Sequence, residues 1–485
     1  MRLFVNSRNQ REKIFSKEAI IKGLAANGGL YVPLTMPEKI DMEEILNLSY
    51  QEIAYRVLSS FLDDFTEEEL KDCIHKAYDT HFTSPDITPI SKIGKDYLLE
   101  LYHGPTAAFK DIALTILPHL LRKSHASQNK KIYILTATSG DTGKAALEGF
   151  KDSEGTFITV FYPKEGVSLV QERQMNTTEG KNTEVIAVQG NFDDCQRLVK
   201  RCYEEISSDR LQLSSANSIN IGRLLPQIVY YFKACAALLK QGSITSKDKV
   251  NFIVPSGNFG NILAGYLAKL LGCPIHKLVC ASNENCVLTE FIKTGVYDRN
   301  REFYQTISPS MDILVSSNLE RLLFLLSHDD EKVSQYMKEL EVKGNYKVDG
   351  ELLESIQEHF EAVFCDEENC KKMIREAYVK EGRLIDSHTA VAYYASKQYG
   401  DENINIIVST ASPYKFSNPI LEALTGERKE NEFDAMRALE KLTGENIPEC
   451  LRKIERLPVL HKRTISLEEG KQVVLERMEK LLCLE

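Results

Sequence analysis

Several features that mark particular protein classes are missing from this 485-residue sequence. No run approaches the ~20 apolar residues needed to span a bilayer, and the N-terminus MRLFVNSRNQREK lacks the apolar stretch of a signal peptide. Lys and Arg number 60 against 70 Asp and Glu, and this net charge of −10 argues against a nucleic-acid-binding protein. We therefore expect a cytoplasmic protein with neither a membrane nor a nucleic-acid partner.

Metal-site and disulfide spacings are also missing. The sequence has no C-x-x-C motif, and its closest pair, Cys365 and Cys370, has no histidine at ligand spacing. The cysteines number 11, and an odd count argues against a fully paired disulfide framework. We expect reduced thiols and no metal.

Short apolar, β-rich segments alternate with helical patterns through the middle of the chain. They are residues 131–137, 156–162, 183–188, 250–255, 277–282 and 404–410. Continuous apolar strands between helices are typical of parallel sheets covered on both faces. Because the segments fall into two clusters, they predict an α/β protein with two doubly wound domains.

The rest of the sequence is mostly helical in pattern. Residues 41–61 carry apolar side chains at helical spacing, and residues 285–385 read as a charge-rich helical insertion. The expected divisions are an N-terminal region (1–95), a first α/β domain (96–245), a second containing the insertion (246–430), and a helical tail (431–485).

Two glycine-rich turns each lie between a predicted strand and a helix. They are TATSGDTGKAAL (136–147) and PSGNFGNILAGYLAKL (255–270). Backbone N–H groups at a helix N-terminus attract anions, and glycine lets a ligand approach the backbone. Thr138 stands at the first glycine position of a Walker A loop and Ala145 follows the lysine, so a nucleotide loop is disfavoured. Either turn alone could be an ordinary connection, but two together favour a ligand with more than one anionic group.

Two further segments carry candidate chemistry. Arg223 ends the segment ANSINIGR (216–223), which opens an amphipathic helix with Pro226 at its first turn or at a kink. The arginine could bind phosphate, or it could cap the helix at the surface. Lys110 lies in HGPTAAFKD (103–111), and a lysine in an apolar setting can form a Schiff base, although most lysines are surface charges. Combined with two anion-binding turns, such a lysine suits pyridoxal phosphate.

Taken in order, these segments resemble the threonine synthase family, within the tryptophan-synthase-β-like, fold-type II pyridoxal-phosphate enzymes. The similarity is strongest to the longer microbial and fungal subgroup and spans residues 4 to about 416. The matching segments are GLAANGGLYVP (23–33), HGPTAAFKD, TATSGDTG, ANSINIGRLLPQ, PSGNFGN and STASPYKF (409–416).

The resemblance implies roles for individual residues. Lys110 would hold the cofactor, and Thr410 would face its pyridine nitrogen. The cofactor phosphate would bind to Gly257, Asn258, Phe259, Gly260 and Asn261. The substrate's anionic end and the cofactor's 3′-oxygen would lie beside Thr138, Ser139, Gly140, Asp141 and Thr142. The substrate phosphate would bind to Asn217, Ser218, Asn220 and Arg223. Many relatives have asparagine in place of Asp141, and a carboxylate there would repel a phenolate oxygen unless one of the two is protonated.

The implied activity is that of a carbon–oxygen lyase acting on phosphates, which converts O-phospho-L-homoserine and water to L-threonine and phosphate. It would be the last step of threonine biosynthesis. Under this hypothesis Lys110 removes the α-proton, and released phosphate near Arg223 assists water addition. The alternatives are a phospho-lyase that yields 2-oxobutyrate, a threonine or serine dehydratase, and an inactive metabolite-binding homologue. A monomer and a homodimer both remain open.

Overall fold

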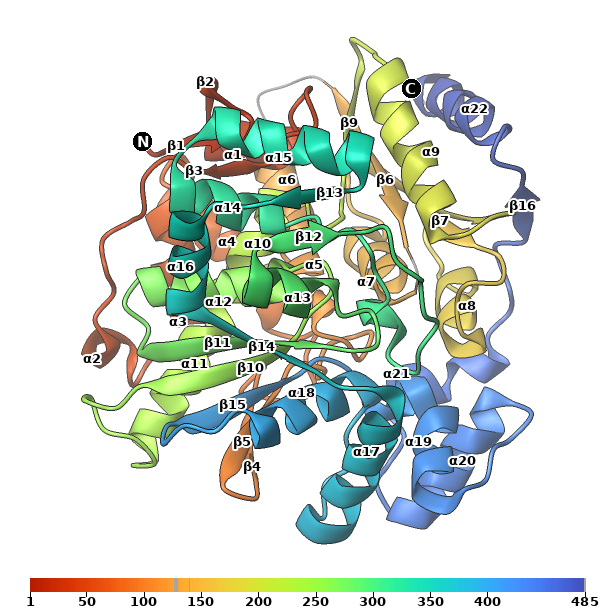
Figure 1. The fold of residues 1–485 in the computed structure, drawn as a ribbon. Helices are drawn as coiled ribbons and strands as arrows, with labels where there is room; N and C mark the ends of the chain where they lie inside the picture. The colour runs from red at the N-terminus through yellow and green to blue at the C-terminus, as the bar shows by residue number, and fades with distance from the viewer. Residues whose placement is uncertain (126–129, 139, 484–485) are drawn as a thin grey trace.

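A computed structural model describes residues 1–125, 130–138 and 140–483. Two open, largely parallel sheets with helices packed on them form the body of the molecule (Figure 1), and a small antiparallel sheet lies near the N-terminus. The predicted fold class, α/β with two doubly wound sheets, is confirmed. Within the described ranges, no helix is both long and apolar enough to cross a membrane.

The five-stranded sheet is parallel throughout, with the strand order β16-β8-β7-β6-β9. Its strands are β6 (Lys131–Ala137), β7 (Thr156–Pro163), β8 (Thr183–Val188), β9 (Leu211–Ser214) and β16 (Arg463–Ile465). The strands predicted at 131–137, 156–162 and 183–188 are therefore confirmed. The C-terminal region, expected to be entirely helical, also contributes β16 to this sheet.

The six-stranded sheet has the order β14-β11-β10-β15-β5-β4, and only β4 runs antiparallel to its neighbour. Its strands are β4 (Ile90–Ile93), β5 (Asp96–Glu100), β10 (Val250–Pro255), β11 (Ile275–Ser282), β14 (Phe360–Phe364) and β15 (Ile404–Ser409). The predicted strands at 250–255, 277–282 and 404–410 are confirmed. Strand β5, which opens the predicted first α/β domain, pairs with β15 in this sheet.

The N-terminal region contains strands as well as the expected helices. Its elements are β1 (Leu3–Asn6), β2 (Asn9–Phe15), α1 (Ser16–Lys22), β3 (Tyr31–Pro33), α2 (Met42–Ile45), α3 (Tyr50–Phe61) and α4 (Glu67–Tyr78). The helical pattern at 41–61 is split in two, because Ser49 and Glu52 form a capping box that starts α3 afresh.

The insertion is largely helical, as expected, with a small two-stranded sheet and the edge strand β14 within it. Its elements are α13 (Val287–Thr294), β12 (Val296–Asp298), η2 (Pro309–Met311), α14 (Leu319–Ser327), α15 (Asp330–Lys343), β13 (Asn345–Lys347), α16 (Gly350–His359) and α17 (Glu367–Glu381). The tail holds α20 (Glu432–Thr443), α21 (Glu449–Arg452), η4 (Ile454–Arg456) and α22 (Gly470–Cys483).

The remaining helices lie around the two large sheets. They are α5 (Lys110–Leu114), α6 (Leu117–His125), α7 (Asp141–Phe150), α8 (Leu169–Asn176), α9 (Phe192–Glu205), α10 (Ile221–Leu224), η1 (Leu225–Gln227), α11 (Ile228–Lys240), α12 (Gly260–Leu270), α18 (Ser387–Gln398), η3 (Pro413–Phe416) and α19 (Ser417–Thr425). Pro226 falls in η1 and separates α10 from α11, which is consistent with the kink that was one of the two expectations for this residue.

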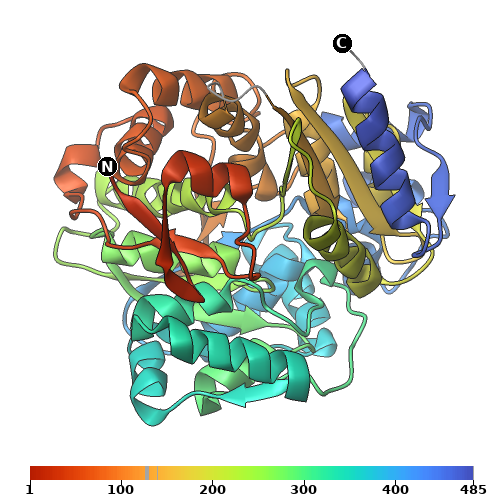
Figure 2. The same ribbon diagram turned by 90° about the horizontal axis from the view of Figure 1, so that it is seen from above.

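One large hydrophobic core joins the N-terminal helices to both large sheets. It includes Phe61, Leu117, Leu147 and Phe252, each fully buried. A second core lies under α18 on the other face of the six-stranded sheet, and a third lies between the five-stranded sheet, α9 and α22. Figure 2 shows α22 (dark blue) beside the strands of that sheet. This packing fixes the carboxyl ends of the strands, where the site lies.

Candidate active site

The predicted site residues follow the carboxyl ends of strands from both large sheets. Lys110 begins α5 soon after β5, and Asp141 begins α7 after β6. The PSGNFGN loop joins β10 to α12, Thr410 follows β15, and Arg223 lies on α10 after β9. Ligands of open α/β sheets bind at this end of the strands, so the topology brings the candidate residues to one region.

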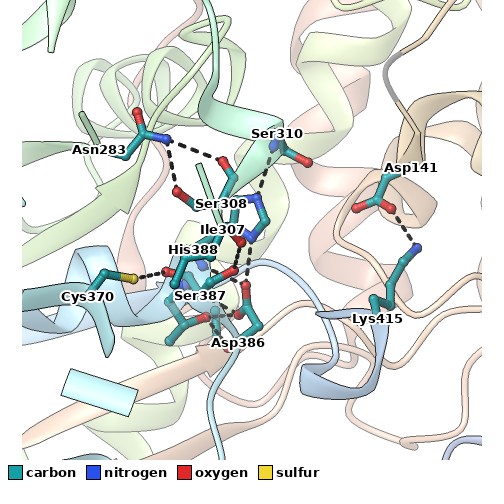
Figure 3. A network of polar contacts seen from close by, with 12 residues as sticks. Asp141, Asn283, Ile307, Ser308, Ser310, Cys370, Asp386, Ser387, His388 and Lys415 are labelled. Atoms are coloured by element: carbon teal, nitrogen blue, oxygen red, sulfur yellow. Dashed lines mark hydrogen bonds and ion pairs between the residues drawn. The ribbon is translucent and has the colours of Figure 1, made fainter. Parts of the chain in front are cut away.

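Lys110, Asp141 and Lys415 form a buried cluster of charges. Oδ1 of Asp141 lies 2.8 Å from Nζ of Lys415, a contact drawn in Figure 3, and Oδ2 lies 3.6 Å from Nζ of Lys110. Nε2 of Gln171 donates to Oδ1 of Asp141 at 2.9 Å, and Lys415 donates to the carbonyl of Thr106 at 3.0 Å. Sequence analysis assigned no role to Lys415 or Gln171, although Lys415 lies within the STASPYKF segment.

Burial and neighbouring charges shift the pKa values of both Lys110 and Asp141. Burial lowers the pKa of Lys110 to about 8; Asp141 opposes this shift, and the cations Arg223 and Lys415 add to it. Burial by itself would raise the pKa of Asp141, but Lys415 and Lys110 outweigh it and hold that pKa below its usual range. The site therefore combines an ionised carboxylate with an amine that can lose its proton near pH 8.

The SGDTG turn is shaped by one of its own side chains. Oγ1 of Thr138 accepts hydrogen bonds from the N–H groups of Gly140 and Gly143, each at 2.9 Å. Gly140 has a φ of +143°, and a Cβ there would lie 2.4 Å from the side chain of Gln171. Only glycine fits position 140, and the side chain of Thr138 holds the N–H groups of Gly140 and Gly143 in place.

Two N–H groups at the start of α7 make no hydrogen bond to a described residue. No described residue accepts a hydrogen bond from the N–H of Asp141 or Thr142, and the helix dipole adds positive potential there. Oγ1 of Thr142 lies 3.5 Å from Nη2 of Arg223. Ser139 is outside the described residues, so its role stays a prediction. These donors beside an arginine suit an anionic group.

The start of α12 also has unpaired donors. In the described part of the chain, the N–H groups of Gly260, Asn261 and Ile262 have no acceptor. Oδ1 of Asn261 accepts from the hydroxyls of Tyr230 and Tyr231 at 2.7 and 2.8 Å, whereas its buried Nδ2 has no partner among these residues. Because an unpaired buried donor is costly, this set fits an anion such as a phosphate group.

Phe259 and Gly260 set the space in front of α12. Phe259 adopts a left-handed conformation with φ of +60°, and its ring packs 5.6 Å from that of Phe360, centroid to centroid. A Cβ on Gly260 would meet only ordinary contacts, the nearest being Nδ2 of Asn318 at 3.5 Å and Cβ of Ser218 at 3.7 Å. The protein itself could therefore accept alanine at position 260.

Residues 306–318 of the insertion hold the PSGNFGN loop in place. Oγ of Ser316 donates to the carbonyl of Gly257 at 2.8 Å. The backbone N–H and Nδ2 of Asn318 both donate to the carbonyl of Asn258, at 3.1 and 2.9 Å. Gly257 and Asn258 thus use their carbonyls for structural contacts. Sequence analysis missed this support, because it comes from a segment that carries no motif.

A buried histidine anchors the same segment (Figure 3). Nε2 of His388 accepts a hydrogen bond from the N–H of Ser310 at 3.1 Å, and Nδ1 lies 2.8 Å from Oδ1 of Asp386. An acceptor role for Nε2 places the proton on Nδ1, which then donates to the carboxylate. Asp386 also caps α18. The only sequence signal for this pair is an ordinary aspartate helix cap.

Arg223 carries a buried positive charge with no acidic partner in the described structure. Its Nη1 donates to the carbonyl of Ala216 at 2.8 Å, and its Nη2 faces Thr142. Burial lowers the pKa of Arg223 to about 10, so the side chain stays charged at neutral pH. A buried cation without a counter-ion is unfavourable, and an anionic ligand would supply one.

The other predicted residues of the ANSINIGR segment are Asn217, Ser218 and Asn220, and they differ in how many of their polar groups already contact the protein. Oδ1 of Asn220 accepts from the N–H of Gly222 at 2.9 Å, and its Nδ2 donates to two backbone carbonyls, each at 3.0 Å. Nδ2 of Asn217 donates to the carbonyl of Ala137 at 2.9 Å. Ser218 is only partly buried. Asn220 caps α10, and its amide hydrogens are already donated to the two carbonyls. Its expected contact with a substrate phosphate stays a prediction.

Thr410 lies against the segment that carries Lys110. Its carbonyl accepts a hydrogen bond from the N–H of Phe109 at 2.8 Å, and the neighbouring Ala108 and Ala411 form an isolated antiparallel bridge. Thr410 is buried, and no described residue pairs with its hydroxyl group. The backbone thus holds Thr410 against the segment that ends at Lys110.

Residues 3–78 match the family model described as the threonine synthase N terminus, and residues 87–410 match that of the pyridoxal-phosphate dependent enzymes. Human threonine synthase-like 1 is 38% identical over 491 residues, an alignment that covers 97% of this chain. The chain spans 64% of the length of that relative.

Two threonine synthases match over nearly their whole length. The protein from Saccharomyces cerevisiae is 36% identical over 464 residues, which cover 87% of this chain and 89% of the yeast protein. The crystal structure of threonine synthase from Brucella melitensis with bound PLP has a TM-score of 0.88 and 32% sequence identity, and the match covers 99% of both chains. The resemblance found in the sequence is confirmed: this chain belongs to the threonine synthase family of pyridoxal-phosphate-dependent enzymes.

Proposed function

We propose that this protein is a threonine synthase that uses pyridoxal phosphate to convert O-phospho-L-homoserine and water to L-threonine and phosphate. The observation that carries the proposal is Arg223, a buried cation that has no acidic partner among the described residues and lies close enough to Lys110 to lower the pKa of that lysine. A substrate with a phosphate group would pair that charge while its reacting carbons lie near the amine.

The residues present fit pyridoxal phosphate. Lys110 would hold its aldehyde carbon, the unpaired N–H groups at the start of α12 and Nδ2 of Asn261 would bind its phosphate, and the hydroxyl of Thr410 would face its ring nitrogen. When bound, this cofactor supplies an electron sink that stabilises negative charge on the carbon next to the substrate amine.

The substrate's two anionic groups would lie on two adjoining sets of donors, at the start of α7 and around Arg223. The N–H groups of Asp141 and Thr142 would bind the carboxylate. Arg223, with Ser218 and Asn217 nearby in sequence, would bind the phosphate through the planar guanidinium. Free threonine and serine have no phosphate and would leave Arg223 unpaired, so this arrangement favours the phosphorylated substrate over a dehydratase reaction.

Lys110 would act as the base of the reaction. Its pKa of about 8 leaves part of the amine unprotonated at neutral pH, so it can accept the proton from the carbon next to the substrate amine. Over the whole reaction phosphate leaves Cγ and a proton leaves Cβ, while Cγ gains a proton and the hydroxyl group of water arrives at Cβ. Arg223 would keep the released phosphate near Cβ, where its oxygens can accept a proton from the attacking water.

We also propose a cytoplasmic enzyme that acts as a monomer or homodimer. All 11 cysteines are free, which supports a reducing compartment. Size-exclusion chromatography with light scattering would determine the oligomeric state.

The proposed function is tested by incubating the purified protein with O-phospho-L-homoserine, with and without pyridoxal phosphate, and measuring phosphate, threonine and 2-oxobutyrate. Threonine and phosphate in equal amounts, only with cofactor, would support the proposal. Phosphate with 2-oxobutyrate would instead indicate a phospho-lyase. Turnover of free threonine or serine without any turnover of the phosphorylated substrate would indicate a dehydratase.

Replacing Gly260 with alanine is expected to weaken pyridoxal phosphate binding about 10-fold or more without destabilising the cofactor-free protein. The added Cβ meets only ordinary protein contacts, at 3.5 Å or more, but would occupy the space in front of the free N–H groups of α12. The dissociation constant is measured from the visible absorbance of the bound cofactor, and stability from thermal unfolding. Gly350→Ala, a helical glycine whose Cβ would meet nothing within 4 Å, is the matched control.

A further inference from the structure

Lys415 is fully buried, and the proposed function gives it no role. It lies on η3, and its Nζ sits 2.8 Å from Oδ1 of Asp141 and 3.0 Å from the carbonyl of Thr106. These two contacts join η3 to the SGDTG turn and to the segment that precedes Lys110. The position of Lys415 therefore bears directly on the charge beside the reactive amine.

The need for a second cation follows from the proposed chemistry of Lys110. To act as a base or nucleophile, Lys110 must be neutral, and its Nζ lies 3.6 Å from Oδ2 of Asp141. At that stage Lys415 would be the one cation paired with the buried carboxylate of Asp141 in the described part of the chain. An isolated buried charge is strongly unfavourable, so without Lys415 the carboxylate would hold the proton on Lys110.

The other titratable groups facing this cluster do not replace Lys415. Arg223 on α10 adds positive charge near Lys110 but makes no ion pair with Asp141. On α5, burial raises the pKa of Asp111 to about 6, and hydrogen bonds from Thr106 oppose this shift. Asp111 is a carboxyl group, so it cannot supply the positive charge of Lys415. Burial raises the pKa of Cys450 on α21 to about 11, so its thiol is neutral.

We propose that Lys415 is a positioning residue of this site, whose ammonium group neutralises Asp141 and so allows Lys110 to lose its proton. The inference deepens the proposed function, because it concerns the same amine. It also accounts for a buried carboxylate at position 141, whose charge Lys415 offsets. Paired with Lys415, Asp141 would add little net negative charge beside a bound cofactor.

The test is the midpoint of the pH titration of Lys110 in the full-length, cofactor-free protein. A small amine-reactive reagent such as acetic anhydride is applied over a pH series, and modification of Lys110 is quantified by peptide mass spectrometry. We expect a midpoint near pH 8 in the wild type. Lys415→Met should raise it by about one pH unit or more, because a nearby cation has been removed. Lys415→Arg, which keeps the charge, should restore most of the wild-type value.

Lys144→Met is the matched control, because Lys144 also lies on α7 but pairs with Glu148 at 2.7 Å and makes no ion pair with Asp141. It should leave the midpoint unchanged. Asp141→Asn should lower the midpoint, since it removes the negative neighbour, and it provides a second test if Lys415→Met does not fold. An unchanged midpoint in folded Lys415→Met, or a midpoint in Asp141→Asn that stays or rises, would overturn the inference.

This titration needs neither cofactor nor substrate, so its outcome is separate from that of the proposed function. If the midpoints move as expected but the protein forms no threonine, the role of Lys415 stands and the assigned reaction fails. If threonine forms but the midpoints do not move, only the inference about Lys415 fails.

Discussion

Replacing Lys110 with alanine is expected to lower kcat about 10³-fold or more and to abolish the visible absorbance of protein-bound pyridoxal phosphate. The variant loses both the group that would hold the cofactor and the base. Turnover of O-phospho-L-homoserine and the absorption spectrum after addition of cofactor measure the two effects. Lys144→Ala removes a lysine of the same region that pairs with Glu148 and Thr178, and it should keep both properties. Substantial turnover by Lys110→Ala would contradict the assignment.

Loss of folding should not explain that result, and Lys110→Met tests this. The folded-state pKa of about 8 lies below the unfolded value of 10.5, so the unfolded chain binds more protons between these values. Burying the charged Lys110 therefore lowers the free energy of unfolding. This cost is fully present below pH 8 and disappears as the pH rises toward 10.5. At pH 7 the free energy of unfolding of the cofactor-free variant should be unchanged or higher, by up to about 3 kcal/mol. Urea unfolding at pH 7 and at high pH measures the difference.

Replacing Arg223 with alanine is expected to raise KM for O-phospho-L-homoserine about 10- to 100-fold. Hydrogen bonds to charged groups contribute about 1.5–3 kcal/mol, which corresponds to changes of this size. Arg223→Lys should restore little, because lysine cannot hold the carbonyl of Ala216 and a phosphate with one planar group. Steady-state kinetics of the three proteins provide the measurement.

The phosphate role of Arg223 is separated from a general structural role by an unphosphorylated ligand. L-Homoserine has the same amine and carboxylate, so its inhibition constant should change little in Arg223→Ala. Equal losses for L-homoserine and for the phosphorylated substrate would show that Arg223 does not act through the phosphate. Thermal unfolding of the cofactor-free variant checks that the site remains folded.

The strands that sequence analysis found share a strong local signal. Strands β6, β7, β8, β10, β11 and β15 are continuous apolar runs, because both faces of a parallel sheet are covered. Strands β14 and β16 are short edge strands without such a run, and β16 adds only three residues, Arg463–Ile465. The pairing of β5 with β15, some 300 residues later, depends on tertiary packing that no local pattern encodes.

The residues of the candidate site divide in the same way, into those that a local motif reveals and those that depend on tertiary contacts. Lys110, Arg223 and the two glycine-rich turns lie in motifs, so their sequence neighbours reveal them. Lys415 and His388 act through contacts with distant segments, Asp141 in one case and Ser310 in the other, and a single sequence does not show such pairs. The carboxylate of Asp141 was expected to repel a phenolate oxygen of the cofactor, and the proposed role of Lys415 would offset that charge through a contact that the sequence alone does not show.

The most direct test of this account is the fate of oxygen when O-phospho-L-homoserine is turned over in water labelled with oxygen-18. The proposed reaction breaks the bond between Cγ and oxygen and adds water at Cβ. We therefore expect one labelled oxygen in the hydroxyl group of L-threonine and none in the phosphate at early times, by mass spectrometry of both products. Labelled phosphate together with L-homoserine would indicate hydrolysis at phosphorus, and would contradict the central claim that Lys110 and Arg223 serve a threonine synthase.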